Sequence, residues 1–179
     1  MPRVMIFVDG ANLYSCVKQA FGVTSVDFEK VRDELTRGRA LVRMYYYNAP
    51  LSAEGHGLEK ARSQQKFFAA LKCMDSVEVR LGKLVGQDSG EYRQKGVDVR
   101  LALDVARYAL QDRYDVAVVV SGDSDVVEAV VIAKDQGKRV ENAFTRLGSS
   151  LELRQASDCF IELDKQFFDR CALRKSSGL

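Results

Sequence analysis

Two acidic residues directly follow an apolar run in the middle of this sequence. The run Val116–Val120 contains four valines and an alanine, and the segment Ser121-Gly122-Asp123-Ser124-Asp125 comes next. Short valine-rich runs are typical of buried strands in parallel sheets, whose ligands bind at the carboxyl ends of the strands. Carboxylates gathered there repel one another, and a bound cation relieves that repulsion. The segment therefore predicts a magnesium-type site, provided that other acids converge on it.

Two further acids are expected at the same place. Asp9 ends the apolar run Val4–Val8, and Asn12 follows it near the start of a predicted helix. Asp98 begins another helix and shares a face with apolar residues such as Leu101, so we expect its side chain to point toward the sheet. The alternative for Asp9 and Asn12 is a helix cap, and for Asp98 an interaction with the helix dipole.

Three other residues have less certain roles. Ser124 could cap the helix that follows it. Asp158 precedes the last predicted strand, and it either reaches the acidic edge from another side or is an ordinary loop acid. For Asp104, the spacing from Arg100 and Arg107 favours a surface ion pair.

Strand and helix patterns alternate along the chain. Strands are expected at Val4–Val8, Leu41–Tyr47, Val77–Val85, Val116–Val120, Arg139–Phe144 and Cys159–Leu163. Helices are expected at Asn12–Phe21, Phe28–Leu35, Leu58–Met74, Val97–Gln111, Ser124–Gln136 and Ser149–Ala156. Strands separated by helices predict an α/β fold, with a mostly parallel twisted sheet between two helical layers. Right-handed crossovers then bring Asp9 and Asp123 to one edge of the sheet.

Composition narrows the class of protein. The chain has 179 residues, 46% of them hydrophobic, which predicts one domain over residues 1–173 with a frayed tail at 174–179. It contains no apolar run of about 18 residues, and the first apolar run meets Asp9 too early for a signal peptide, so a cytoplasmic protein without membrane contact is expected. The four cysteines lack CxxC spacing and His56 is the only histidine, which argues against a zinc site.

Carboxylates without a histidine cluster suit Mg²⁺ or Mn²⁺ better than Zn²⁺. Water held by such a metal can attack a phosphodiester, while the metal offsets charge on the phosphoryl oxygens. This chemistry supports hydrolysis of a phosphate ester, but it does not by itself select nucleic acid.

The motifs together resemble the NYN domain of the PIN-like nuclease superfamily, especially its LabA-like bacterial branch. The resemblance spans about Val4 to Leu163, and it rests on four segments: Val8-Asp9-Gly10-Ala11-Asn12-Leu13, Lys95-Gly96-Val97-Asp98, Ser121-Gly122-Asp123-Ser124-Asp125 and Leu153-Arg154-Gln155-Ala156-Ser157-Asp158-Cys159-Phe160. One departure is Val126, where the family commonly has Phe after the second acid.

The resemblance implies a PIN-like three-layer α/β/α fold and a metal-dependent ribonuclease that uses Mg²⁺ or Mn²⁺. It implies that Asp9, Asp98 and Asp123 hold the metal, with Asp125 as a further ligand or a supporting acid. Asn12 would orient Asp9, a metal-bound water or the scissile phosphate. Ser121 and Ser124 would supply hydroxyls that contact RNA, and Asp158 would complete the acidic ring.

RNA contacts are also expected from basic residues around the loop at residues 86–96. These residues are Arg80, Lys83, Arg93, Lys95 and Arg100, with Tyr92 interleaved. Basic side chains can hold phosphates, and an aromatic ring can stack on an unpaired base. Lys95 is the strongest candidate because it lies three residues before Asp98, although an ordinary solvated loop is an equal alternative.

Two other functions compete with a ribonuclease, and the sequence leaves a homo-oligomer open. An RNA-binding regulatory module would keep the acids without turnover. A haloacid-dehalogenase-like phosphatase also has acidic strand ends, but it needs a second acid two positions after the first, where this chain has Ala11. A dinucleotide-binding domain is disfavoured because the turn after Asp9 lacks the glycine-rich pattern.

Overall fold

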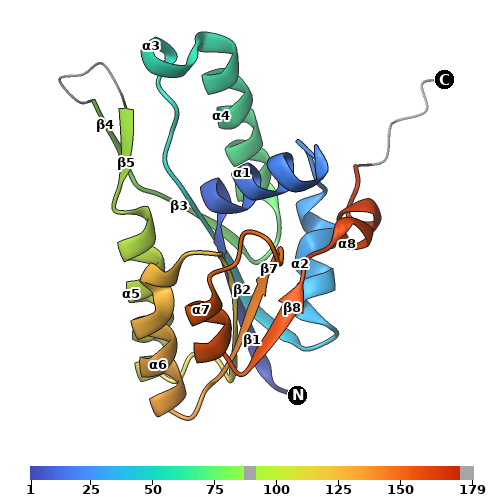
Figure 1. The fold of residues 1–179 in the computed structure, drawn as a ribbon, viewed down its shortest axis with the longest axis vertical. Helices are drawn as coiled ribbons and strands as arrows, with labels where there is room; N and C mark the ends of the chain where they lie inside the picture. The colour runs from blue at the N-terminus through green and yellow to red at the C-terminus, as the bar shows by residue number, and fades with distance from the viewer. Residues whose placement is uncertain (87–91, 174–179) are drawn as a thin grey trace.

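A six-stranded parallel sheet forms the centre of the molecule, with the strand order β3-β2-β1-β6-β7-β8 (Figure 1). The structure is a computed structural model that describes residues 1–86 and 92–173, without the side chains of residues 92–94. The strands of this sheet are β1 (Arg3–Asp9), β2 (Ala40–Asn48), β3 (Val77–Leu81), β6 (Val116–Val120), β7 (Arg139–Phe144) and β8 (Cys159–Glu162). The predicted α/β fold with a parallel sheet is thereby confirmed.

Helices cover both faces of the sheet. They are α1 (Gly10–Phe21), α2 (Phe28–Thr36), α3 (Ala53–His56), α4 (Leu58–Cys73), α5 (Val97–Leu110), α6 (Val127–Asp135), α7 (Leu151–Ala156) and α8 (Lys165–Arg170). Val4, Ile6 and Val8 of β1 pack with α1, α2, α4 and α8, whereas Met5 and Phe7 pack with α5, α6 and α7. Side chains alternate between the faces of a strand, so the apolar run Val4–Val8 within β1 requires a helical layer on each side.

Several elements differ from those that the sequence pattern predicts. The expected strand Val77–Val85 is divided at Gly82 into β3 and β4 (Lys83–Gly86), and β4 forms an antiparallel hairpin with β5 (Tyr92–Lys95). A short 3-10 helix, Ser124–Val126, precedes α6, so the predicted helix Ser124–Gln136 starts differently. The pattern missed α3 and α8, two of the shortest helices. The predicted tail at 174–179 lies outside the described residues, and a single domain over 1–173 stays a prediction.

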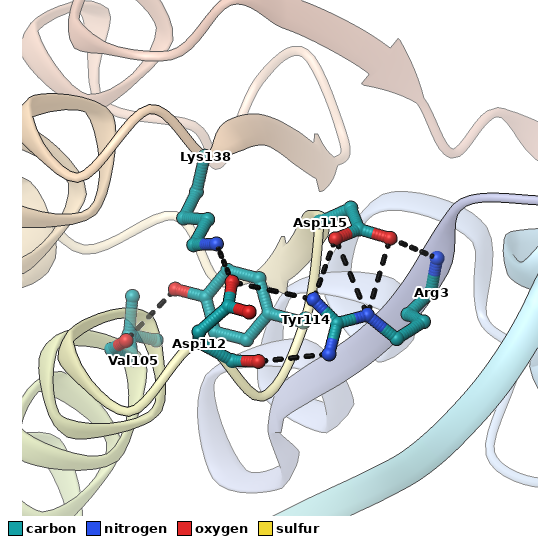
Figure 2. Close-up of polar contacts among 6 residues, drawn as sticks. All are labelled: Arg3, Val105, Asp112, Tyr114, Asp115 and Lys138. Atoms are coloured by element: carbon teal, nitrogen blue, oxygen red, sulfur yellow. Dashed lines mark hydrogen bonds and ion pairs between the residues drawn. The ribbon is translucent and has the colours of Figure 1, made fainter.

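Ion pairs join β1 to the segment that leads into β6, at the amino ends of the strands (Figure 2). Arg3 Nη2 lies 2.7 Å from Asp115 Oδ1, and the Arg3 backbone N–H also donates to Asp115, at 2.7 Å. Asp112 contacts both Arg3 and Lys138. Arg3 holds the pKa of the Asp115 carboxyl down, at about 2. These contacts fix the edge of the sheet that lies opposite the acidic strand ends.

No helix within the described residues is long and apolar enough to cross a membrane. The cytoplasmic location expected from the sequence stays a prediction.

Candidate active site

The strand order reverses between β1 and β6, and both strands end in acidic segments there. Strands β2 and β3 follow β1 on one side, and β7 and β8 follow β6 on the other (Figure 1). Such a switch point opens a crevice at the carboxyl ends of the strands, which is where ligands of open α/β sheets bind. Asp9 is the last residue of β1, and Asp123 follows β6 by three positions. Parallel pairing of β1 with β6 places both residues at this edge.

Asp9 is a buried carboxylate that also caps a helix. It is only 4% exposed, and its Oδ1 accepts a hydrogen bond from the Asn12 N–H at 3.1 Å. Gly10 has no room for a side chain, since a Cβ there would lie 2.1 Å from the Tyr46 ring. The cap that the sequence offered as an alternative is therefore present, but capping alone does not explain why a charged group is buried here.

Hydrogen bonds from three residues hold the segment after β6 in place. Asn12 Oδ1 accepts from the Gly122 N–H at 3.0 Å. Ser121 Oγ accepts from the Asp123 N–H at 3.1 Å and donates to Asp9 Oδ2 at 3.4 Å. Asp123 in turn caps the 3-10 helix by accepting from the Asp125 N–H at 3.0 Å. The two strand ends are thus bonded to each other, and Asp123 rather than Ser124 is the cap.

A residue that the sequence reasoning missed, Asn142 of β7, supports the same segment from behind. Its side chain is fully buried, and Nδ2 donates to the carbonyl oxygens of Val119 at 3.1 Å and Ser121 at 2.9 Å. Ser149 Oγ donates to Asn142 Oδ1 at 3.2 Å. The available signal was an amide within the otherwise apolar half of the strand Arg139–Phe144, where a polar group needs partners.

Asp98 approaches from a third element, α5. Gly96 has a φ of 79°, a left-handed conformation that favours glycine, and it turns the chain from β5 into this helix. Asp98 lies in the first turn and is half-buried, as expected for a side chain that does not point freely into solvent. It forms no ion pair with any described residue.

Electrostatic repulsion links these acids. Burial raises the pKa of Asp9 to about 6, and the charges of Asp98 and Asp123 add to the increase. The pKa of Asp98 is also raised, first by burial and then by Asp123 and Asp125. A bound cation would relieve the repulsion between these negatively charged side chains. Their carboxylate oxygens are ligands that suit a hard cation such as Mg²⁺.

The acids do not form a ready-made ligand set. Across the described residues, no group of three or more His, Cys, Asp or Glu side chains is placed to hold a metal ion. The oxygen donors of these acids fit a divalent metal by their chemistry, although their positions do not complete a ligand set. Asp125 is exposed, and it is the most peripheral of the four acids Asp9, Asp98, Asp123 and Asp125.

Asp158 lies at the other end of the sheet, which corrects the expectation that it completes the acidic ring. Its Oδ2 accepts from the Val140 N–H at 2.7 Å, and its Oδ1 lies 3.4 Å from Lys134 Nζ. Asp158 immediately precedes β8, and Val140 is the second residue of β7. This contact therefore lies at the amino edge of the parallel sheet.

Asp104 also differs from its expected role as a surface ion pair. It is 4% exposed, with Arg107 Nη2 at 2.8 Å from Oδ1 and the Tyr47 hydroxyl at 2.9 Å from Oδ2. Arg80 pairs with the same carboxylate and lies over the Tyr45 ring, 4.3 Å from its centroid. Arg80 is therefore engaged within the protein, and Arg100 is not a partner of Asp104.

The other residues predicted to contact RNA differ in how exposed their side chains are. Ser121 is fully buried, so it positions Asp9 and Asp123 and cannot itself touch RNA in this conformation. Ser124 is half-buried beside Asp123, and Lys95 is exposed at the end of β5. The side chain of Arg93 lies outside the described residues.

Sequence comparison finds uncharacterised relatives of this chain. The chain is 37% identical to the uncharacterised protein y4oD of Sinorhizobium fredii over 99 residues, which cover 54% of this chain and 44% of the relative. It is 25% identical to the uncharacterised protein MJ0482 of Methanocaldococcus jannaschii over 97% of this chain and 60% of the relative. The chain thus spans less than two thirds of the length of these curated relatives.

A solved structure has the same architecture. The crystal structure of a protein of unknown function, VPA0982 from Vibrio parahaemolyticus, superposes with a TM-score of 0.74 at 24% identity, covering 92% of this chain and 94% of that one. The sequence profile of the NYN domain matches residues 3–164. Because that match covers nearly the whole chain, the protein belongs to the NYN domain family, part of the PIN-like nuclease superfamily.

Proposed function

We propose that this protein is a ribonuclease that hydrolyses RNA phosphodiester bonds at the junction of β1, β6 and α5. The observation that carries the proposal is that Asp9 and Asp123 meet at the ends of β1 and β6, where Ser121 bonds to both. Burial raises the pKa of Asp9 there, and the charges of Asp98 and Asp123 add to the increase. Carboxylates whose pKa values are raised by burial and by neighbouring like charges, at an edge where ligands bind, are candidates for a functional site. Membership of a nuclease superfamily supports the same assignment, and a LabA-like placement within it is part of the proposal.

Asp9, Asp98 and Asp123 would hold Mg²⁺ or Mn²⁺, with Asp125 at the rim. The bound metal would supply a water of lowered pKa and charge stabilisation at the phosphoryl oxygens. The protein's own contribution is positioning. Asn12 and Ser121 fix the direction of Asp9 and Asp123, and Asn142 keeps the end of β6 rigid beneath them.

A second function, an RNA-binding module without turnover, is favoured by one observation. Within the described part of the chain, no set of acids is placed for metal binding, as a module that retains the fold without catalysis would show. In a ribonuclease, added metal would draw the acids together, whereas in an RNA-binding module it would not.

The test is cleavage of a labelled RNA by the purified chain with Mg²⁺ or Mn²⁺, compared with Asp123→Asn and Asp98→Asn. Each substitution keeps the size of the side chain, and we expect each to lower the cleavage rate by at least 100-fold. Asp158→Asn is the matched control at the opposite edge and should cleave normally. Equal cleavage by Asp123→Asn would exclude this site, and tight RNA binding without cleavage under all metal conditions would establish the binding module.

A further inference from the structure

Two lysines face each other at the base of the β4–β5 hairpin. Lys83 and Lys95 are directly opposite in the antiparallel register, so their side chains leave the same face with Cβ atoms about 5 Å apart. Both are exposed, and neither forms an ion pair with a described residue. Like charges placed directly opposite each other destabilise a strand pair. The hairpin therefore carries concentrated positive charge that the described protein does not neutralise.

This hairpin is fixed to the helix that carries Asp98. Gly82, between β3 and β4, donates its N–H to the Asn48 carbonyl at 2.8 Å. A Cβ on Gly82 would lie 2.8 Å from the Lys95 carbonyl oxygen and 2.7 Å from Val97 Cγ2, so the base of the hairpin is packed tightly against the start of α5. The lysine pair consequently has a defined position near Asp98, which Lys95 precedes by three residues.

A third cation lies at the same junction. Arg100 is exposed in the second turn of α5, and its Nη1 donates to the Leu81 carbonyl oxygen at 3.0 Å. It has no carboxylate partner among the described residues, in contrast to Arg80 and Arg107, which both pair with Asp104. Leu81 directly precedes Gly82, so this contact holds Arg100 at the base of the hairpin that carries both lysines.

We infer that Lys83, Lys95 and Arg100 form a phosphate clamp that holds the backbone of one RNA strand beside Asp98. The inference builds on the proposed function, since it identifies how the same site would retain its substrate. The acids of the site repel a polyanion, so a strand can stay there only if nearby cations offset that repulsion. Contacts to phosphates carry no base information, so the clamp predicts binding that is independent of sequence.

The experiment measures binding of fluorescently labelled single-stranded RNA by anisotropy from 50 to 200 mM KCl. It uses EDTA and an Asp123→Asn background, so that cleavage does not enter. Each phosphate contact on a single strand contributes about 0.7 to the slope of log K against log salt. The triple variant K83Q/K95Q/R100Q should therefore lose about 2 from that slope. The triple variant should bind RNA more weakly than the parent at 50 mM KCl. The ratio of the two binding constants should be about 16-fold smaller at 200 mM KCl, a fourfold higher salt concentration.

The matched control is R43Q/K66Q/K72Q, which removes the same charge from exposed residues of β2 and α4 that lack ion-pair partners among the described residues. This control should keep the parental slope, and two RNAs of different sequence should bind alike. The three single Gln variants are measured as well, which covers the case of a poorly folded triple variant.

An unchanged slope in the triple and single variants would overturn the clamp, as would a parent chain that binds no RNA at 50 mM KCl. The proposed function fails separately. If the protein binds RNA through these cations but does not cleave it with metal, the clamp stands and the ribonuclease assignment does not.

Discussion

The Asn12 side chain accepts a hydrogen bond from the backbone N–H of Gly122, at 3.0 Å. These residues are 110 positions apart, and their bond joins the end of β1 to the end of β6. Asn12 also donates its own backbone N–H to Asp9, so one residue contacts both acidic segments. The relative positions of Asp9 and Asp123 consequently depend on it.

We expect Asn12→Ala to affect both stability and cleavage. It leaves the buried Gly122 N–H without an acceptor, which costs about 1–3 kcal/mol of unfolding free energy. It also loosens the Ser121–Asp125 segment, so kcat should fall more than RNA affinity. Urea unfolding and single-turnover cleavage measure the two effects. Ser15→Ala, exposed on the same helix, should change neither; a loss no larger than this control would show that the bond is unimportant.

The raised pKa of Asp9 predicts a pH dependence of stability with a definite sign. The folded carboxyl titrates at about 6 and an unfolded Asp near 4, so between these values the folded chain binds more protons. The free energy of unfolding therefore decreases as pH rises from about 4 to 6, and this loss of stability persists above pH 6.

Asp9→Asn should remove this cost. Without divalent metal, the free energy of unfolding of the variant should exceed that of the wild type at pH 7.5 by up to about 3 kcal/mol. This figure follows because a shift of one pKa unit corresponds to 1.36 kcal/mol. The difference should vanish near pH 4, and RNA cleavage should be lost. Urea titrations in EDTA across this range provide the measurement. A variant less stable than the wild type at pH 7.5 would mean that hydrogen bonds of the carboxylate outweigh its desolvation.

Asp104→Asn should reduce stability without removing catalysis. The substitution leaves the Arg80 and Arg107 guanidinium groups facing a neutral amide, with Arg80 mostly buried, and we expect a loss of about 2–4 kcal/mol. Tyr47→Phe removes only one hydrogen bond to the same carboxylate and should cost about 1 kcal/mol. Chemical unfolding separates the two. Cleavage at low temperature should remain near normal in both, and a loss above 100-fold would place Asp104 in the active site.

Arg3→Ala should weaken the amino edge of the sheet in a salt-dependent manner. Arg3 bridges Asp112 and Asp115 on a largely exposed surface (Figure 2). The variant should melt at a lower temperature than the wild type at pH 7, with a smaller difference in 1 M KCl because salt screens exposed charges. The contribution of Asp115 should disappear as pH falls from about 4 toward 2, where its folded carboxyl becomes protonated. A difference independent of salt would indicate lost packing instead.

Much of the fold could be predicted because local patterns determine it. The short apolar runs in β1 and β6 predict buried strands, and the helical segments between the strands predict parallel pairing. Parallel pairing in turn places the residues that follow β1 and β6 at one edge, so Asp9 and Asp123 could be assigned together from sequence alone. The division of Val77–Val85 was missed, because Gly82 interrupts pairing through close packing that no local pattern records.

Tertiary structure alone decided which polar side chains meet. Asn142 supports the end of β6 because the register of β6 and β7 sets it beside Val119, and Asp104 is buried because β2, β3 and α5 bring Tyr47 and Arg80 to it. The pairing of Lys83 with Lys95 follows from the hairpin register, and Asp158 belongs to the opposite edge through its bond to Val140. The sequence thus determined the layers and the acidic strand ends through periodic burial, whereas contacts between distant side chains depend on register and packing.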